Sequence, residues 1–307
     1  MKKIQSVVFG LGRIGLLYGL EKKRIQPASH VEAIKTNKNF NLVGVCDPSK
    51  GNRNLFLKKY GNISHIFNSH MELLLFLKEH EITPQLYVIA TPVNTHFKII
   101  QDIVKTFNDP REKSIIFCEK PLTQNIEYAK KIKKLISKSN YELVVNHSRR
   151  WSKIWNLCNT RIKEIGKIQS ANFLYSTSPE NKSLDQMRDG IHIADLINWF
   201  DIKDKIQVKR LLLPYLVYDF HIWGNKGKIE VLNNGEILNL YKKQKSKRYE
   251  GFFELDLVSK TKQKDLPFKN TYAEFFNFFN SNNIKLSTNL IDAINAINTF
   301  MRYVYEK

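Results

Sequence analysis

Cysteine is scarce in this chain of 307 residues, and the three that it has, Cys46, Cys118 and Cys158, show no CxxC spacing. So sparse and odd a number predicts reduced thiols in a cytoplasmic protein rather than a disulfide framework. The sequence also lacks an HExxH motif and any Cys/His cluster, so we expect no metal site. Nor does any apolar run reach the length that a membrane span requires, so we expect no membrane partner.

The first residues superficially resemble a secretory leader, because Met1-Lys2-Lys3 precedes an apolar run. Arg13 and several glycines interrupt that run, and no small-residue cleavage site follows. We therefore expect the first strand of a fold here.

Acidic residues are also few: 29 Asp and Glu stand against 49 Lys and Arg, which gives a net charge of +20. Such a charge is one sign of a nucleic-acid-binding protein. Here the lysines are interspersed over the whole chain, and the denser clusters at 130–134 and 242–248 carry no nucleic-acid motif. We expect no nucleic-acid partner, although a positive field would attract a phosphorylated or nucleotide-linked substrate.

The first half of the chain alternates apolar strands with amphipathic helices. This alternation predicts an N-terminal Rossmann domain, a doubly wound parallel sheet covered on both faces. The expected strands are 3–9, 41–46, 85–90, 114–118 and 142–147, and the expected helices lie near 14–22, 29–37, 52–60, 70–80, 94–107 and 124–138.

The second half has a different pattern. After a helix at 152–164, a strand at 168–176 and a helix at 190–200, strands are expected in succession at 206–213, 215–222, 227–232, 236–241 and 250–257. Successive strands predict an α+β domain with an open, mainly antiparallel sheet. We expect domains at 1–148 and 149–307, with two closing helices, the last of which packs back on the first domain.

A glycine-rich turn follows the first expected strand at once. In Gly10-Leu11-Gly12-Arg13-Ile14-Gly15, the first glycine permits a tight turn, the second lets backbone approach a phosphate, and the third lets helix and strand pack closely. GxGxxG is a weak signal alone, but the strand before it and the helical pattern after it strengthen the prediction of a dinucleotide site. The expected cofactor contacts in this turn are Gly10, Gly12, Arg13, Ile14 and Gly15.

Asp47 ends the second expected strand, where such sites place an acid that holds the adenosine ribose. It lies 32 residues after Gly15 rather than the usual distance of about 20, because a capping box at Ser29-His30-Val31-Glu32 opens an additional helix. The alternative is a turn residue, since Asp-Pro-Ser is good turn chemistry. An aspartate here repels a 2′-phosphate and favours NAD, whereas Lys50 and Arg53 keep NADP as an alternative.

The loops after the next two expected strands carry further polar residues. In Thr91-Pro92-Val93-Asn94-Thr95-His96 we expect cofactor contacts from Thr91, Asn94 and His96, because ligands bind beyond the carboxyl ends of parallel strands. Asn94 has a helix-capping alternative and His96 that of a helix-surface residue. Glu119 and Lys120 end the following strand, where Lys120 could stabilise negative charge on a substrate oxygen or pair with Glu119.

Asp189, His192 and Asp195 lie three apart on one expected helix, beside an apolar face. Histidine is the natural proton acceptor near neutral pH, so His192 is a candidate acid/base. Each has an alternative: a helix cap for Asp189, a core histidine for His192 and a structural hydrogen bond for Asp195.

Together these pieces resemble the Gfo/Idh/MocA family, named for glucose–fructose oxidoreductase and inositol dehydrogenase. The likeness covers nearly the whole chain, and its motifs are specific as a set rather than singly. The matching segments are Gly10–Gly15, Val45-Cys-Asp-Pro48, Ala90–His96, Glu119-Lys-Pro121, Asn146-His-Ser-Arg-Arg150 and Asp189–Trp199.

The resemblance implies hydride transfer between a nicotinamide cofactor, NAD or else NADP, and a hydroxyl-bearing carbon of a sugar, cyclitol or sugar nucleotide. It implies that Lys120 orients the substrate and assists proton transfer, that Glu119 contacts the nicotinamide-side ribose, and that His192 is the acid/base. Asp189 is expected beside it as a catalytic residue. It further implies a homo-oligomer, a dimer or tetramer, formed through the C-terminal sheet. The expected substrate contacts are Lys120, Arg149, Arg150, Asp189 and His192.

One departure concerns the aspartate. The family more often places it four residues before the histidine, where this chain has Arg188, whereas Asp189 is three before. Either the helix begins one residue later or the aspartate has lost its role. The second possibility motivates an alternative function, a non-catalytic NAD-binding sensor or regulator of the same fold.

Overall fold

The computed structural model describes residues 3–61, 65–107, 113–176, 186–281 and 283–304. The chain forms two compact units, of which the first contains residues 1–146 and 268–294 and the second residues 147–267 and 295–307. The transition at 146/147 lies next to the predicted boundary at 148/149, but a C-terminal segment also belongs to the first unit. That segment comprises α8 (Pro267–Asn280) from residue 268 onward and the first half of α9 (Leu290–Thr299).

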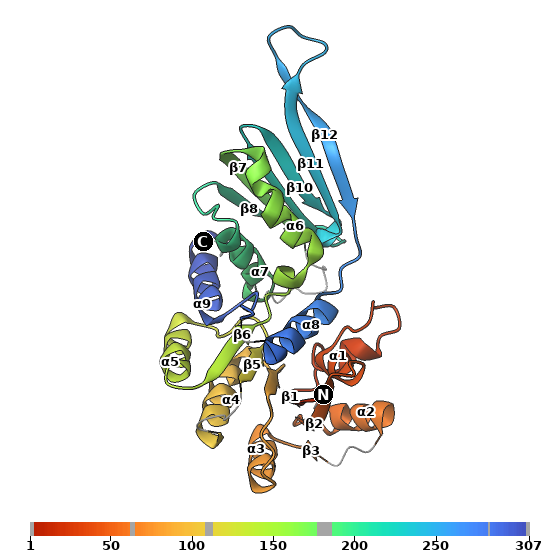
Figure 1. Ribbon diagram of the computed structural model, residues 1–307, viewed down its shortest axis with the longest axis vertical. Coiled ribbons are helices and arrows are strands. Elements are labelled where there is room, and N and C mark those ends of the chain that lie inside the picture. The colour runs from red at the N-terminus through yellow and green to blue at the C-terminus, as the bar shows by residue number, and fades with distance from the viewer. Residues whose placement is uncertain (1–2, 62–64, 108–112, 177–185, 282, 305–307) are drawn as a thin grey trace. The chain divides into compact units, whose positions relative to one another are not determined.

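The first unit is built on a parallel sheet of six strands in the order β3-β2-β1-β4-β5-β6. The strand order reverses beside β1, which pairs with both β2 and β4. The carboxyl ends of the central strands, followed by Gly10, Asp47, Ala90 and Glu119, therefore meet at one edge of the sheet (Figure 1). The strands are β1 Ile4–Phe9, β2 Phe40–Cys46, β3 Ile66–Phe67, β4 Leu86–Ile89, β5 Ser114–Cys118 and β6 Tyr141–Val145.

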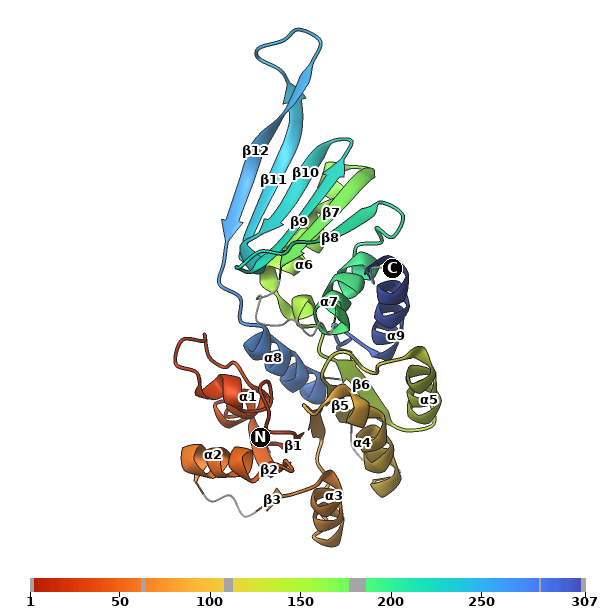
Figure 2. The ribbon, with the colours of Figure 1, turned by 180° about the vertical axis from the view of Figure 1, so that it is seen from behind.

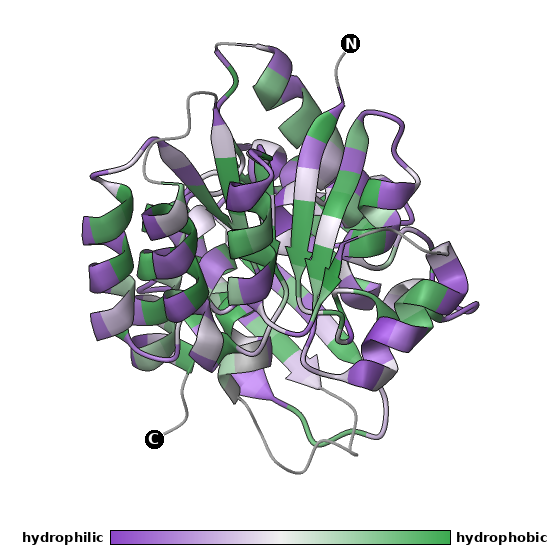
Figure 3. Ribbon diagram, turned by 90° about the horizontal axis from the view of Figure 1, so that it is seen from below, coloured by the Kyte–Doolittle hydropathy of each residue, from purple (hydrophilic) through white to green (hydrophobic). Residues whose placement is uncertain are grey.

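The helices of this unit follow the predicted alternation. They are α1 His30–Lys35, α2 Lys50–Tyr60, α3 His70–Glu79, α4 Val93–Thr106 and α5 Ile126–Ile136, with α8 added from the C-terminal segment. Apolar side chains of these helices pack on strands that are themselves buried, such as β4 and β5. Figure 3 shows largely hydrophobic strands between helices that alternate hydrophobic and hydrophilic residues. The predicted doubly wound parallel sheet is confirmed.

The helix predicted at 14–22 is wrong. The chain after Gly12 forms hydrogen-bonded turns and a short 3₁₀ helix at Leu17–Leu20, and α1 begins only at His30. Amides at the start of α1 donate to the carbonyls of Ile14 and Gly15, at 3.0 Å each. The inserted segment 21–29 therefore lies between the turn and α1, which explains the long spacing from Gly15 to Asp47.

The second unit contains a six-stranded sheet in the order β12-β11-β10-β9-β7-β8. Its pairs are antiparallel except that β7 and β8 run parallel. The sheet is thus mixed and mainly antiparallel, as predicted, and β11 with β12 forms a hairpin longer than its neighbours (Figure 2). The strands are β7 Ile168–Ser176, β8 Ile206–Arg210, β9 Val217–Gly224, β10 Gly227–Leu232, β11 Ile237–Lys245 and β12 Phe253–Lys262.

Helix α6 (Lys153–Arg161) covers one face of this sheet. Its Trp155 is fully buried and stacks parallel to Phe173 of β7 at 6.4 Å between ring centroids, and it lies 5.9 Å from Phe220 of β9. Among the described elements, no helix stands in front of the opposite face in Figure 2. Helix α7 (Gln186–Trp199) packs on the end of α9 and the π-helical turn Phe300–Val304, with Gly190 against Phe300.

The three cysteines are free and buried, and burial raises the pKa of the Cys46 thiol to about 12. Within the described ranges, no helix combines the length and the apolar character needed to cross a membrane.

Candidate active site

The glycine turn after β1 is shaped by two close backbone approaches. Gly10 has φ +95°, and a Cβ on it would lie 2.6 Å from the carbonyl oxygen of Ala90. A Cβ on Gly15 would lie only 2.1 Å from the carbonyl oxygen of Gly10. A Cβ on Gly12, in contrast, would meet no atom within 4 Å. Gly10 and Gly15 are therefore required by the turn itself, whereas Gly12 leaves open space beside the backbone.

The turn also presents unpaired donors. Within the described part of the chain, the amides of Gly12, Arg13, Ile14 and Gly15 donate no hydrogen bond to the protein. The side chain of Arg13 is exposed and that of Ile14 is half-buried. Consecutive amide groups without protein acceptors form an anion-binding concavity. The turn therefore fits the pyrophosphate of a dinucleotide, toward which Arg13 and Ile14 offer backbone amides rather than side chains.

Asp47 fastens the turn to the end of β2. Its Oδ2 accepts from the amide of Leu11 at 2.7 Å, and its Oδ1 accepts from the amide of Ser49 at 2.8 Å. Arg53 donates to the carbonyl oxygen of Asp47 at 2.7 Å. The structure thus shows Asp47 as a turn residue, whereas its contact with the adenosine ribose remains a proposal.

In the loop after β4, the structure rules out the capping alternative for Asn94. Helix α4 begins at Val93 with Pro92 as its N-cap and no side-chain capping bond, so Asn94 is an exposed residue of the first turn rather than the cap. Thr91 is half-buried, and its hydroxyl is 2.7 Å from that of Thr95. Thr91 and Asn94 both lie at the carboxyl end of β4, where the cofactor contact was predicted.

His96 is buried rather than on the helix surface. Its Nε2 lies 2.9 Å from the carbonyl oxygen of Thr91, and its Nδ1 lies 3.1 Å from that of Leu122. The ring therefore links the loop after β4 to the loop after β5. Burial lowers the pKa of His96 below its usual value, against the opposing effect of the two carbonyl oxygens. The structure shows that His96 bridges the two loops, whereas its contact with a cofactor remains a prediction.

Glu119, directly after β5, is the centre of a buried polar network. Its Oε1 lies 2.9 Å from Nε2 of His30 and accepts from the amide group of Asn146 at 2.6 Å. The other ring nitrogen of His30 lies 3.0 Å from the hydroxyl of Tyr272 on α8. Burial alone would raise the pKa of Glu119, but the hydrogen bonds from His30 and Asn146 and the charge of Lys120 lower it below its ordinary value.

Lys120 follows Glu119 and is half-buried, and a cis peptide bond joins it to Pro121. Its backbone amide lies 3.3 Å from Oε2 of Glu119. The first unit therefore brings the glycine turn, Asp47, Thr91, Glu119 and Lys120 to one edge of the parallel sheet.

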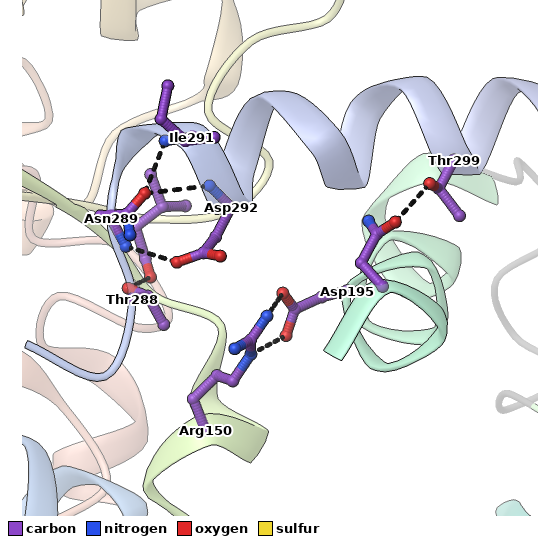
Figure 4. Close-up of polar contacts among 9 residues, drawn as sticks. Arg150, Asp195, Thr288, Asn289, Ile291, Asp292 and Thr299 are labelled. Atoms are coloured by element: carbon purple, nitrogen blue, oxygen red, sulfur yellow. Dashed lines mark hydrogen bonds and ion pairs between the residues drawn. The ribbon is translucent and has the colours of Figure 1, made fainter. Parts of the chain in front are cut away.

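In the second unit, Arg150 forms a buried ion pair with Asp195. The guanidinium donates from Nε to Oδ2 at 2.9 Å and from Nη2 to Oδ1 at 2.8 Å, and the Asp195 side chain is 1% exposed (Figure 4). The guanidinium also lies over Trp199, 4.7 Å from the ring centroid. The structural hydrogen bond considered for Asp195 is thus present, and Arg150 is its partner; a substrate contact of Arg150 remains a prediction.

Helix α7 carries the predicted histidine. His192 is 8% exposed and Asp189 is half-buried, one turn earlier on the same helix. Arg149, from the 3₁₀ turn Ser148–Trp151, lies over the ring of Tyr218 at 4.5 Å. The second unit therefore places a carboxylate and an imidazole on one helix.

Sequence reasoning missed four polar residues. His30, Asn146 and Tyr272 hold Glu119, and Tyr218 has a buried hydroxyl with no hydrogen-bond partner among the described residues. The sequence pattern indicates His30 only as a member of a capping box, with no contact to Glu119. The cap itself is confirmed, because Ser29 accepts from the amide of Glu32 at 3.3 Å, but the Glu32 carboxylate bonds Tyr60 instead of closing the box. Nothing local marks the long-range partners of His30.

Known proteins resemble this chain in sequence and in fold. Residues 4–147 match the model of the Gfo/Idh/MocA family, described as an oxidoreductase family with an NAD-binding Rossmann fold. The predicted cofactor, NAD, is thereby confirmed at the level of the family. A sequence search of the curated proteins found no match.

Solved structures share the fold over almost the whole chain at low identity. UDP-N-acetylglucosamine 3-dehydrogenase GnnA from Acidithiobacillus ferrooxidans is 14% identical, with a TM-score of 0.72 and coverage of 99% of this chain and 97% of that one. The WlbA dehydrogenase from Bordetella pertussis, crystallised with NADH and UDP-GlcNAcA, is 15% identical, with a TM-score of 0.69 and coverage of 96% and 94%. A super-repressor mutant of Gal80p from Saccharomyces cerevisiae is 12% identical, with a TM-score of 0.73 and coverage of 98% and 96%.

Proposed function

We propose that this protein is an NAD-dependent dehydrogenase or reductase, because residues 4–147 match the model of the Gfo/Idh/MocA family of NAD-binding oxidoreductases. Its substrate would be a CH–OH or keto carbon of a sugar, cyclitol or sugar nucleotide. GnnA and WlbA, which resemble this chain in fold, have nucleotide-linked sugars in their names or crystals. The net charge of +20 would favour such an anionic substrate.

The observation that carries the proposal is the edge of the parallel sheet. Unpaired amides of the glycine turn fit a diphosphate, and Glu119 is held as a carboxylate by Asn146 and His30. We assign the turn to the pyrophosphate, Asp47 to the adenosine ribose, and Glu119 to the nicotinamide-side ribose. When bound, the nicotinamide ring supplies the hydride acceptor or donor.

Two residues would serve proton transfer, Lys120 and His192. We assign Lys120 to the substrate oxygen, where its ammonium would stabilise negative charge, and His192 to the hydroxyl proton. Asp189, one turn before His192, would contact the substrate or the imidazole, and Arg149 a further polar group of the substrate.

Turnover of a panel of sugar nucleotides, cyclitols and free sugars, followed by nicotinamide absorbance, tests the proposal. Removal of a good oxyanion donor costs about 3–4 kcal/mol, so Lys120→Ala should lower kcat roughly a hundredfold or more, with little change in NADH affinity. His192→Asn should also lower kcat. If both act in one step, the double variant should lose much less than the product of the single losses.

The control is Lys131→Ala, which removes an exposed ammonium from α5 and should leave kcat unchanged. Unchanged turnover in Lys120→Ala would remove Lys120 from the mechanism.

A second candidate function rests on two observations. The Gal80p super-repressor shares the fold. Asp189 lies three residues before His192, whereas the family more often has an aspartate four residues before this histidine. A regulator would bind NADH stoichiometrically and turn over no member of the panel.

We also propose that the chain forms a homo-oligomer through its second sheet. Leu255 and Leu257 of β12 are 45% and 50% exposed, and Phe253 beside them is 55% exposed. Size-exclusion chromatography with light scattering should give a dimer or tetramer. The variant Leu255→Lys/Leu257→Lys should shift the mass toward the monomer, and a monomeric wild type would contradict the proposal.

A further inference from the structure

The polar network around Glu119 joins segments that are far apart in the sequence. His30 and Glu119 are 89 positions apart, and His30 and Tyr272 are 242 apart. All three side chains are buried, and the His30 ring also meets Phe117 and Phe268 edge-on, at 5.3 and 5.1 Å between ring centroids. The ring is therefore packed between aromatic side chains while its two nitrogens face Tyr272 and Glu119.

The partners assign the hydrogen positions. An ionised carboxylate can only accept, so Nε2 of His30 must carry the hydrogen that points to Glu119. In a neutral imidazole Nδ1 is then an acceptor, and the Tyr272 hydroxyl donates to it. A neutral imidazole therefore satisfies both hydrogen bonds of the series that runs from Tyr272 through His30 to Glu119. No buried charge is needed on the ring.

The two oxygens of the Glu119 carboxylate are used differently. Oε1 accepts from both His30 and Asn146. Within the described residues, Oε2 is met only by the amide of Lys120, at the long distance of 3.3 Å. A carboxylate oxygen accepts about two hydrogen bonds, so Oε2 keeps capacity for a ligand hydroxyl while Oε1 is anchored.

We propose that His30 and Tyr272 are positioning residues for the cofactor, acting through Glu119. Tyr272 fixes the tautomer of His30, and His30 fixes the carboxylate so that Oε2 is presented to a ribose hydroxyl. Helix α8, from the far end of the sequence, is thereby a functional part of the dinucleotide-binding unit rather than only its cover. The inference rests on the assignment of Glu119 to the cofactor under the proposed function.

NADH titration by fluorescence, without substrate, tests this. Hydrogen-bond partners that orient metal-ligating residues are worth about ten- to a hundredfold in metal affinity, and by the same reasoning His30→Ala should weaken NADH binding about tenfold or more. Tyr272→Phe, which removes one hydroxyl, should weaken it about threefold to tenfold. His30→Gln keeps a donor toward Glu119 and should remain within about threefold of the wild type.

The matched control is Tyr141→Phe. The Tyr141 hydroxyl is also partly buried and donates to the carbonyl oxygen of Phe107 at 3.0 Å, but it lies at the start of β6, away from the carboxyl edge. This variant should lose thermal stability and bind NADH like the wild type. If His30→Ala does not fold, Tyr272→Phe decides. Wild-type NADH affinity in a folded Tyr272→Phe or His30→Ala, or equal losses in Tyr141→Phe, would overturn the proposal.

Glu119→Gln separates this inference from the proposed function. If it binds NADH as tightly as the wild type, Glu119 is not a cofactor ligand and the positioning role is refuted. If the variants weaken NADH binding as expected while the wild type turns over no substrate, the positioning role holds and the oxidoreductase proposal fails. If the wild type turns over substrate and the variants bind normally, only the positioning role fails.

Discussion

The two units hold their candidate residues in different ways. In the first unit, the pyrophosphate site is main-chain geometry, with a glycine turn, strand ends and amides without protein acceptors, and side chains from distant segments hold only Glu119. The second unit uses side chains, above all the pair of Arg150 and Asp195, which are 45 positions apart. A main-chain site depends on short contiguous motifs, whereas a side-chain site depends on long-range packing. Substitutions should therefore affect the two units differently.

The largest effect is expected in the glycine turn, where two glycines of the same motif should behave in opposite ways. Gly15→Ala places a methyl group 2.1 Å from the Gly10 carbonyl oxygen, so the turn must open. We expect a loss of thermal stability together with loss of measurable NADH binding. Gly12→Ala meets no protein atom within 4 Å, so it should fold normally and still bind NADH poorly if phosphate approaches there.

Thermal melts and NADH titrations of both variants check this pair. A Gly12→Ala protein with wild-type NADH affinity would contradict the assignment of this turn to the pyrophosphate. A Gly15→Ala protein with wild-type stability would contradict the steric argument.

The next effect belongs to the second unit. Arg150→Ala leaves the buried Asp195 carboxylate without its bidentate partner, and breaking such pairs costs about 3–5 kcal/mol. We expect the free energy of unfolding, measured in urea, to fall by about that amount, while NADH affinity changes little. The double variant Arg150→Met/Asp195→Leu, which removes both charges, should recover most of the loss. Equal losses in the single and double variants would show that packing, and not the charge, is what Arg150 supplies.

This contrast also explains what the sequence could predict. All strands of the first sheet except the two-residue β3 follow from periodicity and local motifs, as do the glycine turn, Asp47 at the end of β2 and Glu119 after β5. No strand was predicted at β3, which is too short to show a periodic pattern. The apolar spacing at 14–22 indicated a helix. The prediction is wrong because Gly12 and Gly15 shape hydrogen-bonded turns there. Asn94 fails as a cap because Pro92 already occupies that position.

The long-range contacts had no local signal. Nothing within a few residues of His30 indicates Glu119 or Tyr272 as partners, because these contacts exist only after the sheet and α8 have assembled. The same holds for Arg150, for which the family resemblance implied a substrate contact and nothing nearby in the sequence indicated an ion pair with Asp195.

We expect the smallest effect on stability at Tyr218. A substitution there also gives the sharpest comparison of the two units. Burial raises the pKa of the Tyr218 hydroxyl well above the usual value, and that hydroxyl has no hydrogen-bond partner among the described residues. Removing a buried group that makes no hydrogen bond is nearly neutral or stabilising, so Tyr218→Phe should leave the melting temperature unchanged or raise it. The ring that supports Arg149 at 4.5 Å is retained.

If Tyr218→Phe nevertheless raises KM for the substrate, the hydroxyl is used only when substrate is present, and the second unit, like the first, keeps an unpaired donor for its ligand. A fall in melting temperature would instead mean that the hydroxyl has a structural partner. Steady-state kinetics and thermal melts on the same preparation therefore decide whether unpaired polar groups mark ligand contacts in both units or only where the main chain supplies them.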